Sequence, residues 1–142
     1  PLTLEITESE LMSDPILAME VLGKLKALGI ATSIDDFGTG YSSLSYLKSL
    51  PIDELKIDRS FVGSMTRDDS DLTIVRSTID LSHNLGLGVV AEGVEDEATM
   101  RQLADLGCDR MQGYHLSRPV PGDELAAWAR SDAWRAVVAG AL

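Results

Sequence analysis

Short apolar runs of strand character alternate with longer segments of helical periodicity along the whole chain, and this order constrains the fold most. The strand-like runs cover residues 2–6, 30–34, 54–57, 88–91 and 110–112. Because the strand–helix units follow one another without a linker, they predict a parallel sheet with helices packed outside it. We therefore expect an α/β fold of about five strand–helix units.

The segments between these runs carry the start and stop signals of helices. The first helix should begin after Ser13 or Asp14 as N-cap, with Pro15 at its first position, and stop at Gly29. Further helices are expected over residues 71–84 and 97–106, and one or two over residues 122–142.

The length of 142 residues suits one domain but not a closed barrel. An eight-stranded barrel of alternating strands and helices typically needs about 250 residues. The chain therefore forms either an open doubly wound sheet or part of a barrel. Its first residues, PLTLEITES, already have the pattern of a β-strand, and they contain neither a starting methionine nor a signal peptide. We expect a piece cut from a longer protein.

The balance of charge disfavours some partners. With 23 acidic and 12 basic residues, the formal net charge of −11 argues against nucleic acid polymers and anionic membranes. No apolar run is long enough to span a membrane. The single cysteine, Cys108, excludes an internal disulfide and a zinc site built from cysteines, and it fits a reducing cytoplasm.

Polar side chains lie within or at the end of every strand-like run: Glu5, the pair Asp35 and Asp36, Lys56, Glu92 and Gln112. In parallel α/β folds the carboxyl ends of the strands point to one face, and active sites are built there. Each run therefore places one or two polar side chains at this common face, which we call the mouth. Structural salt bridges inside a barrel are the alternative.

The adjacent carboxylates of Asp35 and Asp36 have two interpretations. One is a turn in which an aspartate side chain binds the loop backbone. The other is a metal site, because carboxylates this close repel each other unless hard cations such as Mg²⁺ or Mn²⁺ neutralise them. Together with Glu5 and Glu92, the pair favours the metal site, and the turn remains the alternative.

Lys56, in the stretch DELKID, also has two interpretations. It can neutralise Asp53 or Asp58 at the edge of a strand, or it can orient a water or a phosphate beside a metal pair. His83 and His115 are not expected to be metal ligands, because no second histidine stands at a ligand spacing.

Four stretches in fixed order resemble a known family. They are LEITES, DDFGTGYSSLSYLKSLPIDELKIDRSFV, VVAEGVE and QGYHLSRP, and the likeness runs from residue 2 to about residue 125. They resemble the EAL domain, the bacterial phosphodiesterase that opens cyclic di-GMP to linear pGpG. The resemblance implies a partial TIM-type (β/α) barrel, with residues 1–142 as the C-terminal portion of a single EAL domain whose N-terminal strands are missing.

The resemblance also implies two divalent cations, Mg²⁺ or Mn²⁺, in the complete domain. By position, Glu5 corresponds to a ligand of the first ion and Asp35 to the bridge between both ions. Asp36 and Glu92 correspond to ligands of the second ion. The same likeness places Asp35 and Glu92 among the catalytic residues and Asp36 beside the substrate.

Three further roles follow from the resemblance. Lys56 corresponds to the catalytic lysine that holds the attacking water, and Gln112 to the glutamine that contacts the substrate. Glu8 corresponds to the glutamate that steadies the loop over residues 37–43. Cyclic di-GMP carries two phosphodiester charges, so cations are needed to screen it from an acidic mouth.

The Glu-Ala-Leu motif that names the family does not occur in the chain. We therefore expect a competent phosphodiesterase in the parent protein and an inactive fragment here. The alternative is a non-catalytic cyclic di-GMP receptor or protein-interaction module, which altered ligands would mark. Two open sheet edges also predict a homodimer or higher oligomer. We expect a cytoplasmic location, with membrane tethering only through other domains of the parent.

Overall fold

A computed structural model of the chain describes residues 2–38 and 44–130. Strands and helices alternate along it, as the sequence predicts. The elements are β1 (Thr3–Thr7), α1 (Glu8–Ser13), α2 (Pro15–Ala27), β2 (Ala31–Phe37), α3 (Leu44–Leu47), β3 (Glu54–Ile57), α4 (Arg59–Val62), α5 (Asp69–Asn84), β4 (Gly88–Glu92), α6 (Glu97–Asp105), β5 (Arg110–Gln112) and α7 (Gly122–Arg130).

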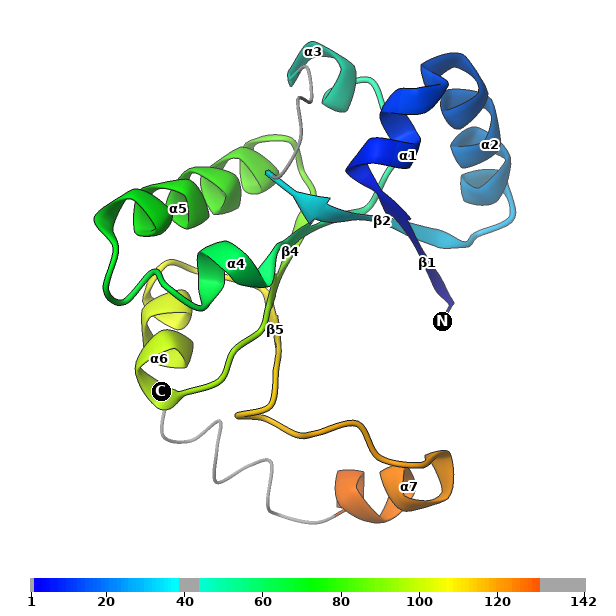
Figure 1. Cartoon of the computed structure of the whole chain (residues 1–142). Coiled ribbons are helices and arrows are strands. Elements are labelled where there is room, and N and C mark those ends of the chain that lie inside the picture. The colour runs from blue at the N-terminus through cyan, green and yellow to red at the C-terminus, as the bar shows by residue number, and fades with distance from the viewer. Residues whose placement is uncertain (1, 39–43, 131–142) are drawn as a thin grey trace.

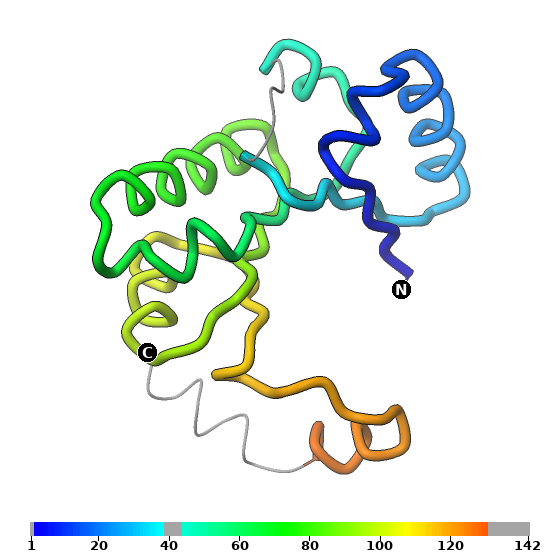
Figure 2. The backbone as a smooth tube through the Cα atoms, in the orientation of Figure 1, coloured from blue at the N-terminus to red at the C-terminus, as the bar shows by residue number. Residues whose placement is uncertain are grey.

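The five strands form one parallel sheet in the order β1-β2-β3-β4-β5. The sheet curves, with α1 to α6 on its convex side (Figure 1). The backbone trace shows the segment with α7 reaching out beyond β5 on the concave side of the sheet (Figure 2). This is the partial barrel that the family resemblance implies and one of the two folds that the strand pattern allows. The other, a doubly wound sheet with helices on both faces, is wrong.

Two hydrophobic clusters between the sheet and the helices hold the fold together. One centres on β3, β4, α5 and α6, and includes Ile57, Val75, Val89 and Leu103. The other joins β2 to α1, α2 and α3, and it includes Ile34. Because side chains alternate along a strand, these apolar residues leave the neighbouring positions for the concave face.

The first long helix confirms the predicted capping signals. The Asp14 carboxylate accepts a hydrogen bond from the N–H of Leu17 at 3.0 Å, and Pro15 occupies the first turn. Gly29 has a φ of +73°, the left-handed conformation that ends a helix and that glycine adopts without strain.

Other boundaries differ from the prediction. β2 continues to Phe37 rather than ending at residue 34, and α5 begins at Asp69 because Asp68 caps it. The short helices α1, α3 and α4 were not predicted. In the C-terminal segment α7 ends at Arg130, and the predicted helical continuation to residue 142 lies outside the described residues. None of the helices in residues 2–38 and 44–130 has both the length and the apolarity of a membrane span.

Candidate active site

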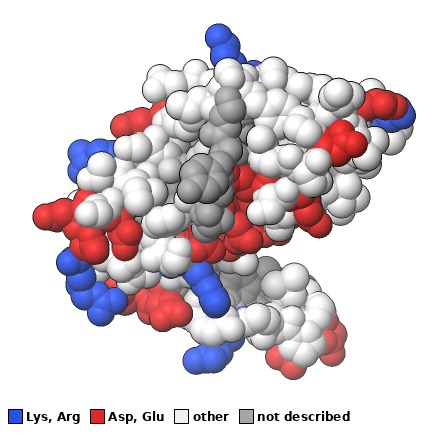
Figure 3. Space-filling model, turned by 45° about the horizontal axis from the view of Figure 1, so that its top comes forward, with Lys and Arg blue, Asp and Glu red and all other residues white. Residues whose placement is uncertain are grey.

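Lys56 of β3 stands at the centre of a cluster of carboxylates on the concave face. Its Nζ lies 2.9 Å from Oε2 of Glu5, 3.0 Å from Oδ1 of Asp35 and 2.6 Å from Oε1 of Glu92. These acidic residues come from β1, β2 and β4, so one ammonium group joins side chains from three of the other four strands. The lysine side chain is only 6% exposed. Acidic side chains gather in the hollow of the molecule (Figure 3).

The register of the sheet explains this convergence. Ile34, Leu55, Ile57, Val89 and Ala91 pack under the helices. The alternating positions on the same strands therefore face the concave side. The four residues are staggered along it, since Glu5 pairs with Ser33 and Lys56 pairs with Val90. The structure thus brings together four of the residues that the sequence singled out.

The interpretation of Lys56 as a partner for Asp53 or Asp58 is wrong. Asp53 instead lies 3.4 Å from the ammonium of Lys26 and accepts a hydrogen bond from the N–H of Thr32 at 2.9 Å. Asp58 caps α4 by accepting from the N–H of Ser60 at 2.9 Å. Both nearby aspartates therefore bind groups other than Lys56.

The surroundings of Lys56 keep it charged. Burial by itself would lower the pKa of its ammonium group. The hydrogen bonds that it donates to Glu92, Glu5 and Asp35 outweigh this effect and raise the pKa above its ordinary value. The lysine is therefore a permanent cation among three carboxylates.

Asp36 follows Asp35 in β2 and lies in an unusual backbone conformation. Its φ is +55°, a left-handed value that few residues other than glycine adopt, and its N–H donates to Oδ1 of Asp35 at 3.1 Å. The pairing of β2 with β3 is irregular here, between Ile34 and Phe37. The pair therefore lies in an irregular strand segment rather than in a turn after the strand.

Several acidic groups lie close to Asp36. Burial, followed by the charges of Asp35 and Asp58, raises the pKa of the Asp36 carboxyl. A hydrogen bond with Asp58 acts in the same direction. The pKa of Asp58 is lowered: burial opposes the change, and hydrogen bonds from the Ser60 hydroxyl and N–H outweigh it. Asp58 is a neighbour of the site that the sequence analysis missed, although it directly follows β3 at a helix N-cap.

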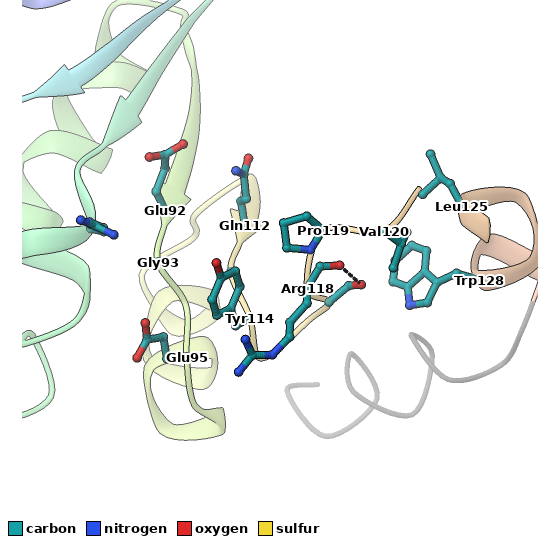
Figure 4. Close-up of a pocket in the computed structure, with 13 residues that line it drawn as sticks. Glu92, Gly93, Glu95, Gln112, Tyr114, Arg118, Pro119, Val120, Leu125 and Trp128 are labelled. Atoms are coloured by element: carbon teal, nitrogen blue, oxygen red, sulfur yellow. Dashed lines mark hydrogen bonds between the residues drawn. The ribbon is translucent and has the colours of Figure 1, made fainter. Parts of the chain in front are cut away.

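Glu92 and Gln112 are the last residues of β4 and β5 and pair with each other in the sheet. Beyond them, the N–H of Val94 donates to the carbonyl oxygen of Gln112 at 3.1 Å. Gly113 permits this approach, because a Cβ there would lie 2.1 Å from the carbonyl oxygen of Val94. The side chains of Glu92 and Gln112 consequently lie next to each other (Figure 4).

A pocket of about 450 Å³ adjoins these two residues. Its walls include Glu92 and Gln112 on one side and Trp128 of α7 on the other (Figure 4), and Arg59 also lines it. The Arg118 guanidinium lies 4.7 Å from the centre of the Tyr114 ring within the same lining. The pocket therefore combines positive charge, aromatic surface and the polar ends of β4 and β5.

Glu8 lies away from this cluster, at the start of α1, and it is almost fully buried. Its Oε2 accepts a hydrogen bond from the N–H of Gly38 at 3.1 Å, which is the point where the chain leaves β2. Residues 39–43 of the loop lie outside the described residues, so the loop-steadying role of Glu8 stays a prediction.

The donor chemistry of the cluster suits a hard cation, although Lys56 supplies the central positive charge in this arrangement. Carboxylate oxygens are the ligands that Mg²⁺ and Mn²⁺ prefer. Over residues 2–38 and 44–130, no group of three or more His, Cys, Asp or Glu side chains is arranged to hold a metal ion. Burial, followed by the charges of Asp35 and Asp58, nevertheless raises the pKa of Asp36, so acidic groups are crowded on this side of the cluster.

Comparison with known proteins places the chain among characterised relatives. A family model described as EAL domain matches residues 1–119. MucR of Pseudomonas aeruginosa, a bifunctional diguanylate cyclase and cyclic di-GMP phosphodiesterase, is 50% identical over 126 residues, which are 89% of this chain and 18% of MucR. The chain thus spans less than a fifth of that relative.

Solved structures agree with the sequence comparison. The MucR phosphodiesterase in complex with cyclic di-GMP has a TM-score of 0.85 at 50% identity, over 87% of this chain and 50% of that one. The EAL domain of Mycobacterium smegmatis DcpA has a TM-score of 0.83 at 48% identity, over 90% and 59%. A manganese and cyclic di-GMP complex of Klebsiella pneumoniae BlrP1 has a TM-score of 0.76 at 36% identity, over 82% and 30%.

Proposed function

This chain belongs to the EAL domain family, and on that premise we propose that it supplies the C-terminal part of an active site that hydrolyses cyclic di-GMP to linear pGpG. The observation that carries the proposal is the convergence of Glu5, Asp35 and Glu92 on the ammonium of Lys56. Four side chains from four strands meet in the hollow, at the carboxyl ends where parallel α/β folds build their sites.

The proposal includes two divalent cations, Mg²⁺ or Mn²⁺, held by Glu5, Asp35, Asp36 and Glu92. When bound, such ions screen the phosphate charge and lower the pKa of a bound water. The manganese complex of BlrP1 with cyclic di-GMP supports this choice of metal through a relative. The acidic groups gathered around Asp36, which include Asp35 and Asp58, support it from the chain itself.

The residues of the chain have distinct proposed tasks. Lys56 has three N–H donors, and any carboxylate that turns away from Nζ frees one of them to orient a water or a phosphoryl oxygen. The amide of Gln112, which is exposed at the mouth, can hydrogen-bond the substrate. In the reaction the water oxygen bonds to phosphorus, one ring P–O bond breaks, and the departing oxygen takes up a proton.

We propose that the 142 residues are inactive by themselves. Only two of the proposed ligands, Glu5 and Asp35, serve the first ion, and the chain contains no Glu-Ala-Leu segment. Two carboxylates hold such an ion weakly when no further protein ligand joins them. The chain also matches half of the solved MucR phosphodiesterase, so the other half is the natural source of the missing ligands.

A chimera tests the proposal directly. This chain replaces the matching segment of the MucR phosphodiesterase, to which it is 50% identical. With Mn²⁺, the chimera should convert cyclic di-GMP to pGpG, and the 142-residue chain should not. The Lys56→Met variant of the chimera should be inactive. Its matched control, Lys26→Met, should remain active. A folded chimera that binds cyclic di-GMP without hydrolysing it would support the receptor alternative instead.

We also propose that the β1 edge associates with another chain when the 142 residues are alone. Among the described residues β1 has one strand neighbour, β2. An apolar groove of about 410 Å³ beside it is lined by Leu4, Ile6 and Val21 among others. A homodimer or larger oligomer would cover this surface. Sedimentation equilibrium should give at least twice the 15.3 kDa monomer mass, and a folded monomer would contradict this.

A further inference from the structure

A second pair of charges lies on the concave face, at the first residues of two strands. Glu54 begins β3 and Arg110 begins β5, and the Arg110 Nη1 donates a hydrogen bond to Oε2 of Glu54. The Glu54 side chain is 11% exposed, whereas that of Arg110 is 70% exposed. A nearly buried carboxylate is thus neutralised by a cation at the open side of the sheet.

The two residues do not belong to neighbouring strands, because β4 runs between β3 and β5. Opposite Glu54 in the sheet, β4 has Gly88. A Cβ at that position would lie 3.8 Å from Oε2 of Glu54. That distance is an ordinary van der Waals contact, so the Glu54 carboxylate lies directly beside the backbone of β4 at Gly88.

Each partner stands two residues before a residue of the mouth. Glu54 stands two residues before Lys56 on β3, and Arg110 stands two residues before Gln112 on β5. Since side chains alternate along a strand, Glu54 points to the same face as Lys56, and Arg110 to the same face as Gln112. β5 is a short strand of 3 residues, and its two ends are exposed. Its place therefore depends strongly on the few contacts that reach it from the interior.

We propose that Glu54 and Arg110 are positioning residues that hold β5 in place and so set Gln112 beside Glu92 for contact with cyclic di-GMP. The part of this statement that concerns the substrate rests on the proposed function. The pair acts through the strands: it does not touch the reacting groups, but it fixes the distance between β3, with Lys56, and β5, with Gln112.

Amide hydrogen exchange of the 142-residue chain tests the positioning without reference to activity. The N–H groups of Val94 and His115 bind the carbonyl oxygens of Gln112 and Val94 at 3.1 and 3.0 Å, so their exchange reports whether β5 stays docked. In Arg110→Met they should exchange at least about tenfold faster, whereas the α5 amides should change little. Arg110→Lys, which keeps the charge, should restore most of the protection.

Two further variants keep the test decisive. Arg110→Met leaves the Glu54 carboxylate buried without its partner, which can impair folding. Glu54→Gln removes that charge as well as the ion pair, so it tests the same contact without a buried unpaired carboxylate. It too should speed the exchange of the Val94 and His115 amides. The control is Arg101→Met, which breaks the exposed pair between Arg101 and Glu97 on α6. Exchange at Val94 and His115 that matches the control would overturn the proposal.

Kinetics of the MucR chimera test the link to the substrate. Arg110→Met should raise KM for cyclic di-GMP several-fold and change kcat by less than about twofold, because it displaces a binding group rather than a reacting one. Arg110→Lys should recover the KM. An active chimera with unchanged KM would overturn the proposal. An inactive parent chimera would instead refute the proposed function, and hydrogen exchange would still decide the positioning.

Discussion

β3 and β1 belong to the same parallel sheet, yet β3 is buried along its whole length and β1 is largely exposed. Both contribute to the cluster at the mouth: β3 supplies Lys56, and β1 supplies Glu5. The Glu5 side chain is 52% exposed, and that of Glu92, from the inner strand β4, is 20% exposed. Water screens the Glu5 contact much more than the Glu92 contact. The site therefore has a rigid side at β3 and β4 and a weakly held side at β1.

The largest expected difference between the two strands concerns their apolar residues. Leu55 of β3 is fully buried, and Leu4 of β1 is 38% exposed. Leu55→Ala should lower the free energy of unfolding by about 3 kcal/mol, because it leaves a cavity under the helices. Leu4→Ala should lower it by less than about 1 kcal/mol. Urea denaturation of both variants measures these losses, and equal losses would remove the contrast between the strands.

Lys56→Met should have the next largest effect, since it leaves three carboxylates facing one another without their cation. Removal of one partner from a buried charge cluster is strongly destabilising, and partial exposure of the acids reduces the loss to about 2–3 kcal/mol. Lys26→Met, which breaks an exposed pair with Asp53, should lose less than about 0.5 kcal/mol. Denaturation in EDTA measures both variants. A Lys56→Met chain as stable as wild type would contradict the account of the cluster.

The two glutamates of the cluster sharpen the comparison. Glu92→Gln weakens a largely buried contact of 2.6 Å, and Glu5→Gln weakens an exposed contact of 2.9 Å. We expect Glu92→Gln to lower the free energy of unfolding by about 1 kcal/mol and Glu5→Gln to lower it by less than about 0.5 kcal/mol. Double-mutant cycles with Lys56→Met isolate each coupling energy. A larger coupling for Glu5 would reverse the assignment of the rigid side.

The smallest effect concerns pH and the junction of β4 with β5. Asp109 accepts hydrogen bonds from the Val89 N–H at 2.9 Å and interacts with Nε2 of His83 at 3.1 Å. Burial would raise the pKa of Asp109, but these contacts outweigh it and lower the pKa below the ordinary value. A lowered folded-state pKa stabilises the protein above the unfolded-state pKa of about 3.9, and the contribution disappears as pH falls through the folded-state pKa.

Asp109→Asn should therefore lower the free energy of unfolding by less than about 0.5 kcal/mol at pH 7, because the side chain is 45% exposed. The difference from wild type should vanish below the folded-state pKa. Thermal unfolding across the pH range measures it, and a difference that grows on acidification would contradict the assigned sign.

Much of the fold could be predicted because the apolar pattern is local. The positions of all five strands follow from runs of apolar residues, and the helix α2 follows from Asp14, Pro15 and Gly29. The end of β2 was placed too early, because Asp35 and Asp36 have the composition of a loop. A strand tolerates them here, since Asp35 faces Lys56 in the hollow and Asp36 lies in an irregular segment. The four-residue helix α4 gives no periodicity to detect.

The site divides in the same way. The convergence of Glu5, Asp35, Lys56 and Glu92 follows from one rule, that parallel strands present their carboxyl ends at one face. The pair of Glu54 and Arg110 follows from no local pattern, because it joins residues 56 positions apart across an intervening strand. The contact between Asp36 and Asp58 likewise depends on how β2 and α4 meet in space.

The central claim is that carboxylates from three separate strands share the ammonium of Lys56, and a crystal structure of the chain grown in EDTA tests it most directly. The account predicts Nζ of Lys56 within hydrogen-bond distance of Glu5, Asp35 and Glu92. A lysine directed to Asp53 or Asp58, with the three carboxylates apart, would contradict it.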